Sequence, residues 1–372
     1  MKLAIAGLAV TAAVALAGSA HGQNVPAQFV VSGKTAEKIQ DFTTINLATA
    51  ERIADSCEKA ATDQGVQISL MVLDHDGNQV YMDRMDGQGY LNIITAEMKA
   101  RTALLGREPS KNRMNRDIQD PSHEFEDIQL GLFANSGGLP IVVDKQLIGV
   151  VGVGGSAPHP PAWSDEICGH KALVEVFGPS VAPLVEDIPP RPGQGNAPVP
   201  RFAAAPAPKS TLPAEYVVGG KGASNIFDAN QISLATAKKI ARGCRDWAAS
   251  NGGTVSIYVL DNTGEFVHME RMDGQISNSM HSALLKAQTA LKTRQPTSIR
   301  AAQLKNDPGG LPRYSVFFNL YAVSGGLPIV VDGQMIGAVG VGGIGGGDKD
   351  ELCAVAGLKA TFGDHVALPV YP

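Results

Sequence analysis

The sequence predicts an α+β fold that occurs twice in tandem, each copy having a largely antiparallel sheet flanked by helices. Three observations predict it. Of the 372 residues, 44% are hydrophobic and 18% are charged, which supplies enough apolar side chains for one or two cores. The second half of the chain repeats the first. Within each half, stretches of helical periodicity alternate with pairs of short apolar runs joined by turns, a pattern typical of α+β domains.

The repeat is clearest in two motifs that each occur once in either half. The tetrapeptide Arg-Met-Asp-Gly lies at 84–87 and again at 271–274. The nonapeptide Ser-Gly-Gly-Leu-Pro-Ile-Val-Val-Asp lies at 136–144 and again at 324–332. The period is too long for a solenoid, and each copy is long enough to bury a core of its own. The chain is therefore a domain duplication.

The two domains are expected at 27–180 and 214–372, separated by a linker at 181–213 that is rich in Pro and Ala. Such a composition favours extended chain and cannot bury a core. Because a duplicated chain can fuse partners once related by a two-fold axis, we expect the two copies to pack as a pseudo-dimer.

Residues 1–22 are predicted to be a signal peptide. Lys2 precedes an apolar, Ala-rich run at 3–18, and small residues suited to cleavage follow at Ala20 and Gly22. The alternative is a membrane anchor, but the run is short for a bilayer span and has no cationic flank after it. We expect a mature protein that is periplasmic or secreted and that does not insert into the membrane after signal cleavage.

The first part of each copy is predicted to be a helix, a hairpin and a second helix. Asn46 and Ser233 are good N-caps, and apolar residues follow each of them at helical spacing. In copy one the expected strand, turn, returning strand and helix lie at 68–73, 74–77, 79–85 and 91–105.

The second part of each copy is predicted to be a loop, a hairpin and a final helix. The stretch after the second helix is polar, and we expect it to be a long loop. Apolar runs at 139–143 and 147–153 then predict two strands, and a final helix is expected at 164–177. The residues Arg84 and Arg271, at the ends of their hairpins, are expected to anchor the turns at their own neighbours Asp86 and Asp273.

Taken in order, these motifs resemble the GlcG/HbpS family of haem-binding proteins. The residues that carry the resemblance are the Val-Leu-Asp-x-x-Gly hairpin ending in Arg-Met-Asp-Gly, the Lys-Ala-x-Thr-Ala helix at 99–103 and 286–290, and the Gly-Gly-Leu-Pro-Ile-Val-Val-Asp strand followed by Gly-Val-Gly-Gly. The resemblance implies a profilin-like fold, assembly into homo-oligomers, and haem as cofactor, with haem degradation found among members. It brings no invariant haem-ligand motif.

Four residues of the two second helices are candidates for binding a ligand. Lys99 and its counterpart Lys286 could neutralise an anionic group such as a haem propionate, and Arg101 lies beside Lys99. For an axial haem ligand we select His281, on the second helix of copy two. The alternative for each is a solvated helix face. The chain has 8 histidines and none recurs in the other copy, so a duplicated histidine metal centre is not expected.

The function predicted from these features is haem storage, delivery or degradation outside the cytoplasm. The alternative is an enzyme or accessory subunit acting on a small carboxylate or oxidised organic compound. A third possibility is an assembly module for a neighbouring oxidoreductase, and the sequence does not decide whether the protein is an enzyme. Nucleic acid is excluded as a partner, because the net charge is −5 and no block of Lys and Arg stands out.

The four cysteines form two equivalent pairs on the first and last helices of the copies. In an exported protein such a set indicates disulfides, although four buried thiols are the alternative. Pairing within a copy preserves the repeat and joins the first helix to the last. We therefore predict the disulfides Cys57–Cys168 and Cys244–Cys353.

Overall fold

The fold is described from a computed structural model of the chain. The structure describes residues 25–157, 160–189, 209–226, 228–306 and 311–369. The predicted signal peptide and most of the predicted linker lie outside these residues. In the described part, no helix has both the length and the apolar character needed to cross a bilayer.

Copy one contains four strands and six helices among the described residues. Its elements are α1 (Gly33–Ile39), α2 (Leu47–Asp63), β1 (Ser69–Asp74), β2 (Gln79–Arg84), α3 (Tyr90–Gly106), α4 (Ser110–Gln119), α5 (Ser122–Gln129), β3 (Gly138–Val143), β4 (Gln146–Gly154) and α6 (Asp165–Phe177).

Copy two repeats this order, with a 3₁₀ helix at the place of α1. Its elements are η1 (Gly220–Asn225), α7 (Leu234–Ser250), β5 (Ser256–Asp261), β6 (Phe266–Arg271), α8 (Ser277–Thr293), α9 (Thr297–Asn306), α10 (Leu311–Phe318), β7 (Gly326–Val331), β8 (Gln334–Gly342), α11 (Gly347–Phe362) and η2 (Gly363–His365). The predicted α+β class and its duplication are confirmed.

The expected long loop after α3 was wrong, because it contains the two short helices α4 and α5. These helices lack a strong apolar stripe, and a buried carboxylate joins them instead. Arg113 of α4 donates to Asp127 of α5 at 2.9 Å, and Arg116 donates to the same oxygen at 2.7 Å. A polar helix held by tertiary ion pairs has no periodic apolar pattern, so hydrophobic spacing alone does not indicate it.

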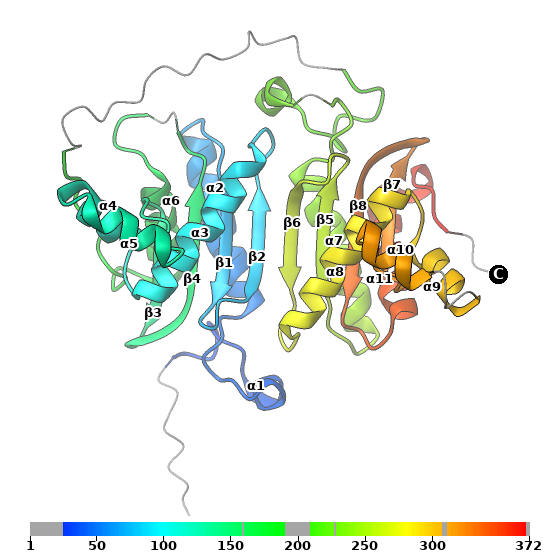
Figure 1. Cartoon of the computed structure of the whole chain (residues 1–372), viewed down its shortest axis with the longest axis horizontal. Coiled ribbons are helices and arrows are strands. Elements are labelled where there is room, and N and C mark those ends of the chain that lie inside the picture. The colour runs from blue at the N-terminus through cyan, green and yellow to red at the C-terminus, as the bar shows by residue number, and fades with distance from the viewer. Residues whose placement is uncertain (1–24, 158–159, 190–208, 227, 307–310, 370–372) are drawn as a thin grey trace, which may run out of the picture.

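The two copies share one eight-stranded sheet in the order β3-β4-β1-β2-β6-β5-β8-β7, in which all neighbours are antiparallel (Figure 1). The copies meet where β2 pairs with β6, and Met82 lies opposite Met269 at the centre of that pairing. A pseudo-two-fold axis therefore passes between these two strands. The copies do pack as the expected pseudo-dimer.

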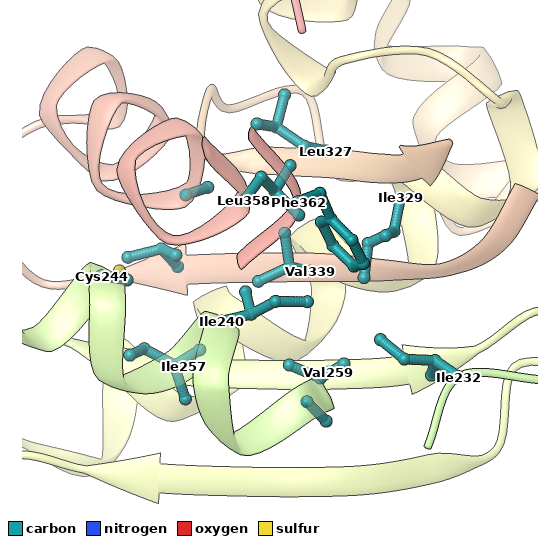
Figure 2. Close-up of a cluster of buried hydrophobic side chains, with 14 of the residues drawn as sticks. Ile232, Ile240, Cys244, Ile257, Val259, Leu327, Ile329, Val339, Leu358 and Phe362 are labelled. Atoms are coloured by element: carbon teal, nitrogen blue, oxygen red, sulfur yellow. The ribbon is translucent and has the colours of Figure 1, made fainter. Parts of the chain in front are cut away.

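Helices cover both faces of this sheet. On one face lie α2 and α6 of copy one with α7 and α11 of copy two, and on the other lie α3 and α8 (Figure 1). Each copy has its own core beneath its helix pair. Figure 2 shows the core of copy two. Its labelled residues are Ile232, Ile240, Cys244, Ile257, Val259, Leu327, Ile329, Val339, Leu358 and Phe362. The core under α3 and α8 contains residues from both copies, so the pseudo-dimer also shares a core.

Glycines in β4 and β8 let α3 and α8 lie directly on the sheet. A Cβ atom at Gly152 would come within 1.9 Å of the Ala96 carbonyl oxygen, and one at Gly340 within 2.0 Å of the Ala283 carbonyl oxygen. Any side chain would push the helix away from the strand. The glycine-rich ends of β4 and β8 are therefore needed for close packing.

One disulfide in each copy joins the first helix to the last. Cys57 of α2 is bonded to Cys168 of α6, and Cys244 of α7 is bonded to Cys353 of α11. This is the pairing within each copy that we expected from the repeat. Each bridge closes a loop of more than 100 residues that includes the four strands of its copy, since the cysteines are 111 and 109 positions apart.

Candidate functional site

The tetrapeptide Arg-Met-Asp-Gly builds the contact between the copies. Arg84 Nη2 donates to Asp261 Oδ2 of the other copy at 2.6 Å, and Arg271 Nη2 donates to Asp74 Oδ2 at the same distance. All four side chains are buried. Each arginine also anchors its own turn, as expected, since Arg84 Nη1 donates to the Gln88 carbonyl at 2.8 Å and Arg271 Nη1 donates to the Gln275 carbonyl at 3.0 Å. What the sequence did not predict is that the same side chain extends across the β2–β6 pairing to a hairpin of the other copy.

The aspartate of the same motif caps a helix in the opposite copy. The backbone N–H of Leu234, the first residue of α7, donates to Asp86 Oδ1 at 2.8 Å. The N–H of Leu47, the first residue of α2, donates to Asp273 Oδ1 at 2.8 Å. Burial raises the pKa of both carboxyls, while these helix N–H groups act in the opposite direction. The motif recurs in both copies because each copy supplies the same contacts to the other.

A cleft opens at this junction on the face that carries α3 and α8, and we call it the junction cleft. Its volume is about 290 Å³. Its lining residues come from both copies: Gly77, Asn78, Gln79, Glu97, Arg101, Tyr258, Phe266, Ser277, Met280, His281 and Leu284. Two of the four candidate ligand residues, Arg101 and His281, therefore lie at one site, although they are 180 positions apart in the chain.

The floor of the junction cleft is aromatic. Tyr258 is buried, and its hydroxyl donates to Gln79 Oε1 of the other copy at 2.5 Å. The ring of Phe266 lies 5.6 Å from that of Tyr258 and 5.3 Å from that of Tyr90, measured between centroids. Burial raises the pKa of the Tyr258 hydroxyl well above its ordinary value, so this group is neutral at physiological pH. The floor therefore offers flat apolar contact and one fixed hydroxyl.

Polar groups of the junction cleft lie along its rim. Arg101 donates to Glu97 through Nε and Nη2, at 2.9 and 2.6 Å, and to the Gly77 carbonyl at 3.1 Å. This arrangement holds the guanidinium in place and offsets part of its charge. His281 is exposed on the opposite wall. The cleft is asymmetric, because the position equivalent to His281 in copy one is Ile94.

The candidate lysines are used inside each copy. Lys99 Nζ donates to Asp165 Oδ2 at 2.7 Å, and Lys286 Nζ donates to Asp350 Oδ2 at 2.7 Å. Both side chains are almost fully buried, and neither lines the junction cleft. The structure therefore corrects the expectation that Lys99 and Lys286 are available to neutralise a haem propionate. Helical spacing places these residues on α3 and α8, but a buried and an exposed lysine have the same sequence signal.

The opposite face of the junction holds a buried ionic cluster that sequence reasoning missed. His268 of β6 lies opposite Asp83 of β2, with 2.6 Å between His268 Nδ1 and Asp83 Oδ1. Lys238 of α7 approaches the other oxygen of Asp83 at 2.8 Å. A signal was present in the repeat, because His268 stands where copy one has Tyr81 and Lys238 stands where copy one has Glu51.

A third polar group, formed by Asp41, His75 and Asp76, has atoms close enough to hold a metal ion. These atoms already bond to one another, with 2.9 Å between His75 Nε2 and Asp41 Oδ2. The equivalent residues of copy two form the same contact, with an amide in place of the imidazole: Asn262 donates to Asp228 at 2.7 Å. The feature that the two copies share is thus a contact between two loops.

Comparisons with known proteins match each copy separately. A family model described as haem degrading protein HbpS-like matches residues 45–173 and 232–359. The chain is 32% identical over 122 residues to an uncharacterized 15.0 kDa protein in the dhaT-dhaS intergenic region of Citrobacter freundii, covering 32% of this chain and 84% of that protein.

Two further relatives show the same relation to a single copy. Protein GlcG of Escherichia coli K12 is 34% identical over 110 residues, which cover 30% of this chain and 80% of GlcG. The crystal structure of HbpS is 32% identical, with a TM-score of 0.34, and covers 37% of this chain and 94% of that chain.

Proposed function

The chain belongs to the HbpS-like family, and from this premise we propose that it binds haem in the junction cleft between its two copies. The observation that carries the proposal is the meeting of His281 and Arg101 over the aromatic floor of Tyr258 and Phe266. The family model, which describes a haem degrading protein, supports the choice of ligand.

The residues present fit a haem that is only partly enclosed. His281 would hold the haem iron through its imidazole, and the iron would supply redox chemistry. Met280, Leu284 and Phe266 offer apolar contact to the ring, and Arg101 offers a donor to a propionate. The volume of about 290 Å³ lies at the lower end of the range for pockets that enclose drug-sized molecules. The cleft would therefore enclose only part of a porphyrin.

Haemin titration tests this proposal. We expect the mature protein to give a sharp Soret band that saturates at one equivalent, and His281→Ala to weaken binding by about tenfold or more, equivalent to one good contact. The matched control is His123→Ala, because His123 lies on α5 outside the junction cleft. Equal affinities of the two variants would contradict a role for His281, and broad absorbance without saturation would contradict haem binding.

The alternative ligand is a small carboxylate or oxidised organic compound, and the limited volume of the cleft favours it. Asn78 and Ser277, which hydrogen-bond to each other across the junction, add neutral polar groups to the rim beside Arg101. A ligand of this size would fit within the volume of the cleft, whereas haem would extend beyond it. Competition of small carboxylates with haemin, measured by the same Soret band, separates the two candidates.

We further propose that the mature chain functions in the periplasm or outside the cell. Two disulfides support this location, since such bonds persist in oxidising compartments. Mass spectrometry of the mature N-terminus tests it, with cleavage expected after Ala20 or Gly22. A full-length chain retained in the cytoplasm with four alkylatable thiols would contradict it.

A further inference from the structure

The helices α2 and α7, which face each other across the junction, carry opposite charges at equivalent positions. Three acids of α2 fall on one helical face, and the equivalent positions of α7 all carry bases. The pairs of equivalent positions are Glu51 with Lys238, Asp55 with Arg242, and Glu58 with Arg245. A duplication begins with identical copies, so the two faces have since become complementary.

These charges meet across the junction. Lys238 Nζ lies 3.0 Å from Glu58 Oε2 and 3.2 Å from Asp55 Oδ1. Glu51 is approached at 3.4 Å by Arg245 Nη1 and at 4.0 Å by Arg242 Nη2. Every acid of the α2 face thus has a basic neighbour on α7.

The same cations neutralise acids in the sheet below. Asp83 of β2 and Glu270 of β6 occupy equivalent positions, and both are almost fully buried. Lys238 lies 2.8 Å from Asp83, and Arg245 lies 3.2 Å from Glu270. Consider instead a junction formed by copy one of two different chains. Each chain would then bury its Asp83 beneath an α2 helix, and the charged face of α2 carries acids in place of the bases of α7.

The buried junction contacts of the tetrapeptide do not distinguish the copies. The Arg84–Asp261 and Arg271–Asp74 pairs are equivalent, and so are the helix caps made by the aspartates of the tetrapeptide. A pairing of identical copies could form all of them. The charged faces of α2 and α7 would then each be matched with a face of the same sign, and like charges facing each other oppose association.

We propose that the junction is a heterotypic interface, in which the acidic face of α2 accepts the basic face of α7 and rejects a second acidic face. The partner that fits copy one is therefore a copy two. Copy two of the same chain is the preferred partner, because the linker tethers it to copy one and so raises its effective concentration above that of copy two from other chains. The shared contacts of the tetrapeptide provide affinity, and the charges provide selectivity.

Full-length charge variants test this proposal. The acid-only chain carries Lys238→Glu, Arg242→Asp and Arg245→Glu, whereas the base-only chain carries Glu51→Lys, Asp55→Arg and Glu58→Arg. The exchanged chain carries all six substitutions. Small-angle scattering reports whether the copies remain together, light scattering reports chain association, and circular dichroism reports the fold of each copy.

We expect the acid-only and base-only chains each to lose the compact closed form, to stay unassociated alone, and to form a complex of one chain of each kind when mixed. The exchanged chain should be as compact as the native protein. A single-sign chain that stays closed, or that pairs with itself as readily as with the other, would overturn the proposal. If the single-sign chains do not fold, the exchanged chain decides, and its failure to close would overturn the proposal.

Discussion

His268 should make the stability of the junction depend on pH between neutral and alkaline conditions. The groups that face its ring are Asp83 at 2.6 Å, Glu270 at 3.7 Å, and the ring of Tyr81 at 5.3 Å between centroids. Lys238 is bound to the same Asp83. Burial by itself lowers the pKa of His268, but the carboxylates of Asp83 and Glu270 outweigh it and raise the pKa to about 9.

The sign and size follow from proton linkage. The folded pKa of about 9 lies above the ordinary value of 6.5, so the folded protein holds a proton that the unfolded chain releases between these values. The stabilisation is therefore complete below about pH 6.5 and is lost as the pH rises through 9. At about 1.4 kcal/mol for each pH unit, the total loss in the free energy of unfolding is about 3 kcal/mol.

Urea unfolding of the oxidised protein between pH 6 and pH 10, compared with His268→Gln, measures this contribution. The difference in free energy between native and variant should shrink by about 3 kcal/mol across that range. Burial also raises the pKa of Glu58, but this residue is present in both proteins, so the comparison isolates His268. His365→Gln is the control, because that exposed imidazole pairs with Asp332 at the surface. A constant difference between native protein and His268→Gln would refute the reasoning.

Three further predictions concern packing, the junction and the disulfides. Gly152→Ala should lower the free energy of unfolding by about 1–3 kcal/mol because its Cβ would press on α3, whereas Gly89→Ala, in open space, should not; equal thermal midpoints would contradict this. Arg84→Met should lower the free energy of unfolding by about 3–5 kcal/mol, because it leaves the buried Asp261 without its ion-pair partner. Replacing Asp261 by Leu as well should recover much of that loss, and a double variant no more stable than Arg84→Met would contradict this reasoning. Cys168→Ser should cost roughly 5 kcal/mol by opening a loop of 111 positions, as measured by denaturation without reductant; unchanged stability would show that the bridge does not constrain the unfolded chain.

Much of the fold could be predicted because its signals are local. The N-caps Asn46 and Ser233 accept hydrogen bonds from Thr49 and Thr236, as expected from their positions before periodic apolar residues. The polar helices α4 and α5 could not be predicted in this way, because ion pairs between Asp127 of α5 and two arginines of α4 hold them together. Local pattern detects elements that bury an apolar face, and it misses elements held by distant charges.

The candidate site was predictable only in part. Placing a ligand near a junction and on the second helices selected Arg101 and His281, which do line the junction cleft. The same reasoning selected Lys99 and Lys286, which are buried against aspartates. A helix position determines which neighbours a side chain has along the helix, but burial depends on what packs against it.

By itself, the sequence determined the duplication, the order of strands and helices apart from α1, α4, α5 and their counterparts in copy two, and the equivalence of the cysteine pairs. These follow from recurrence and from periods of two and 3.6 residues, which are properties of short segments. Only the tertiary structure decided that Arg84 binds Asp261, that His268 lies on Asp83, and that the acids of α2 meet the bases of α7. Each of these contacts depends on the register in which β2 pairs with β6, and that register joins residues about half a chain apart.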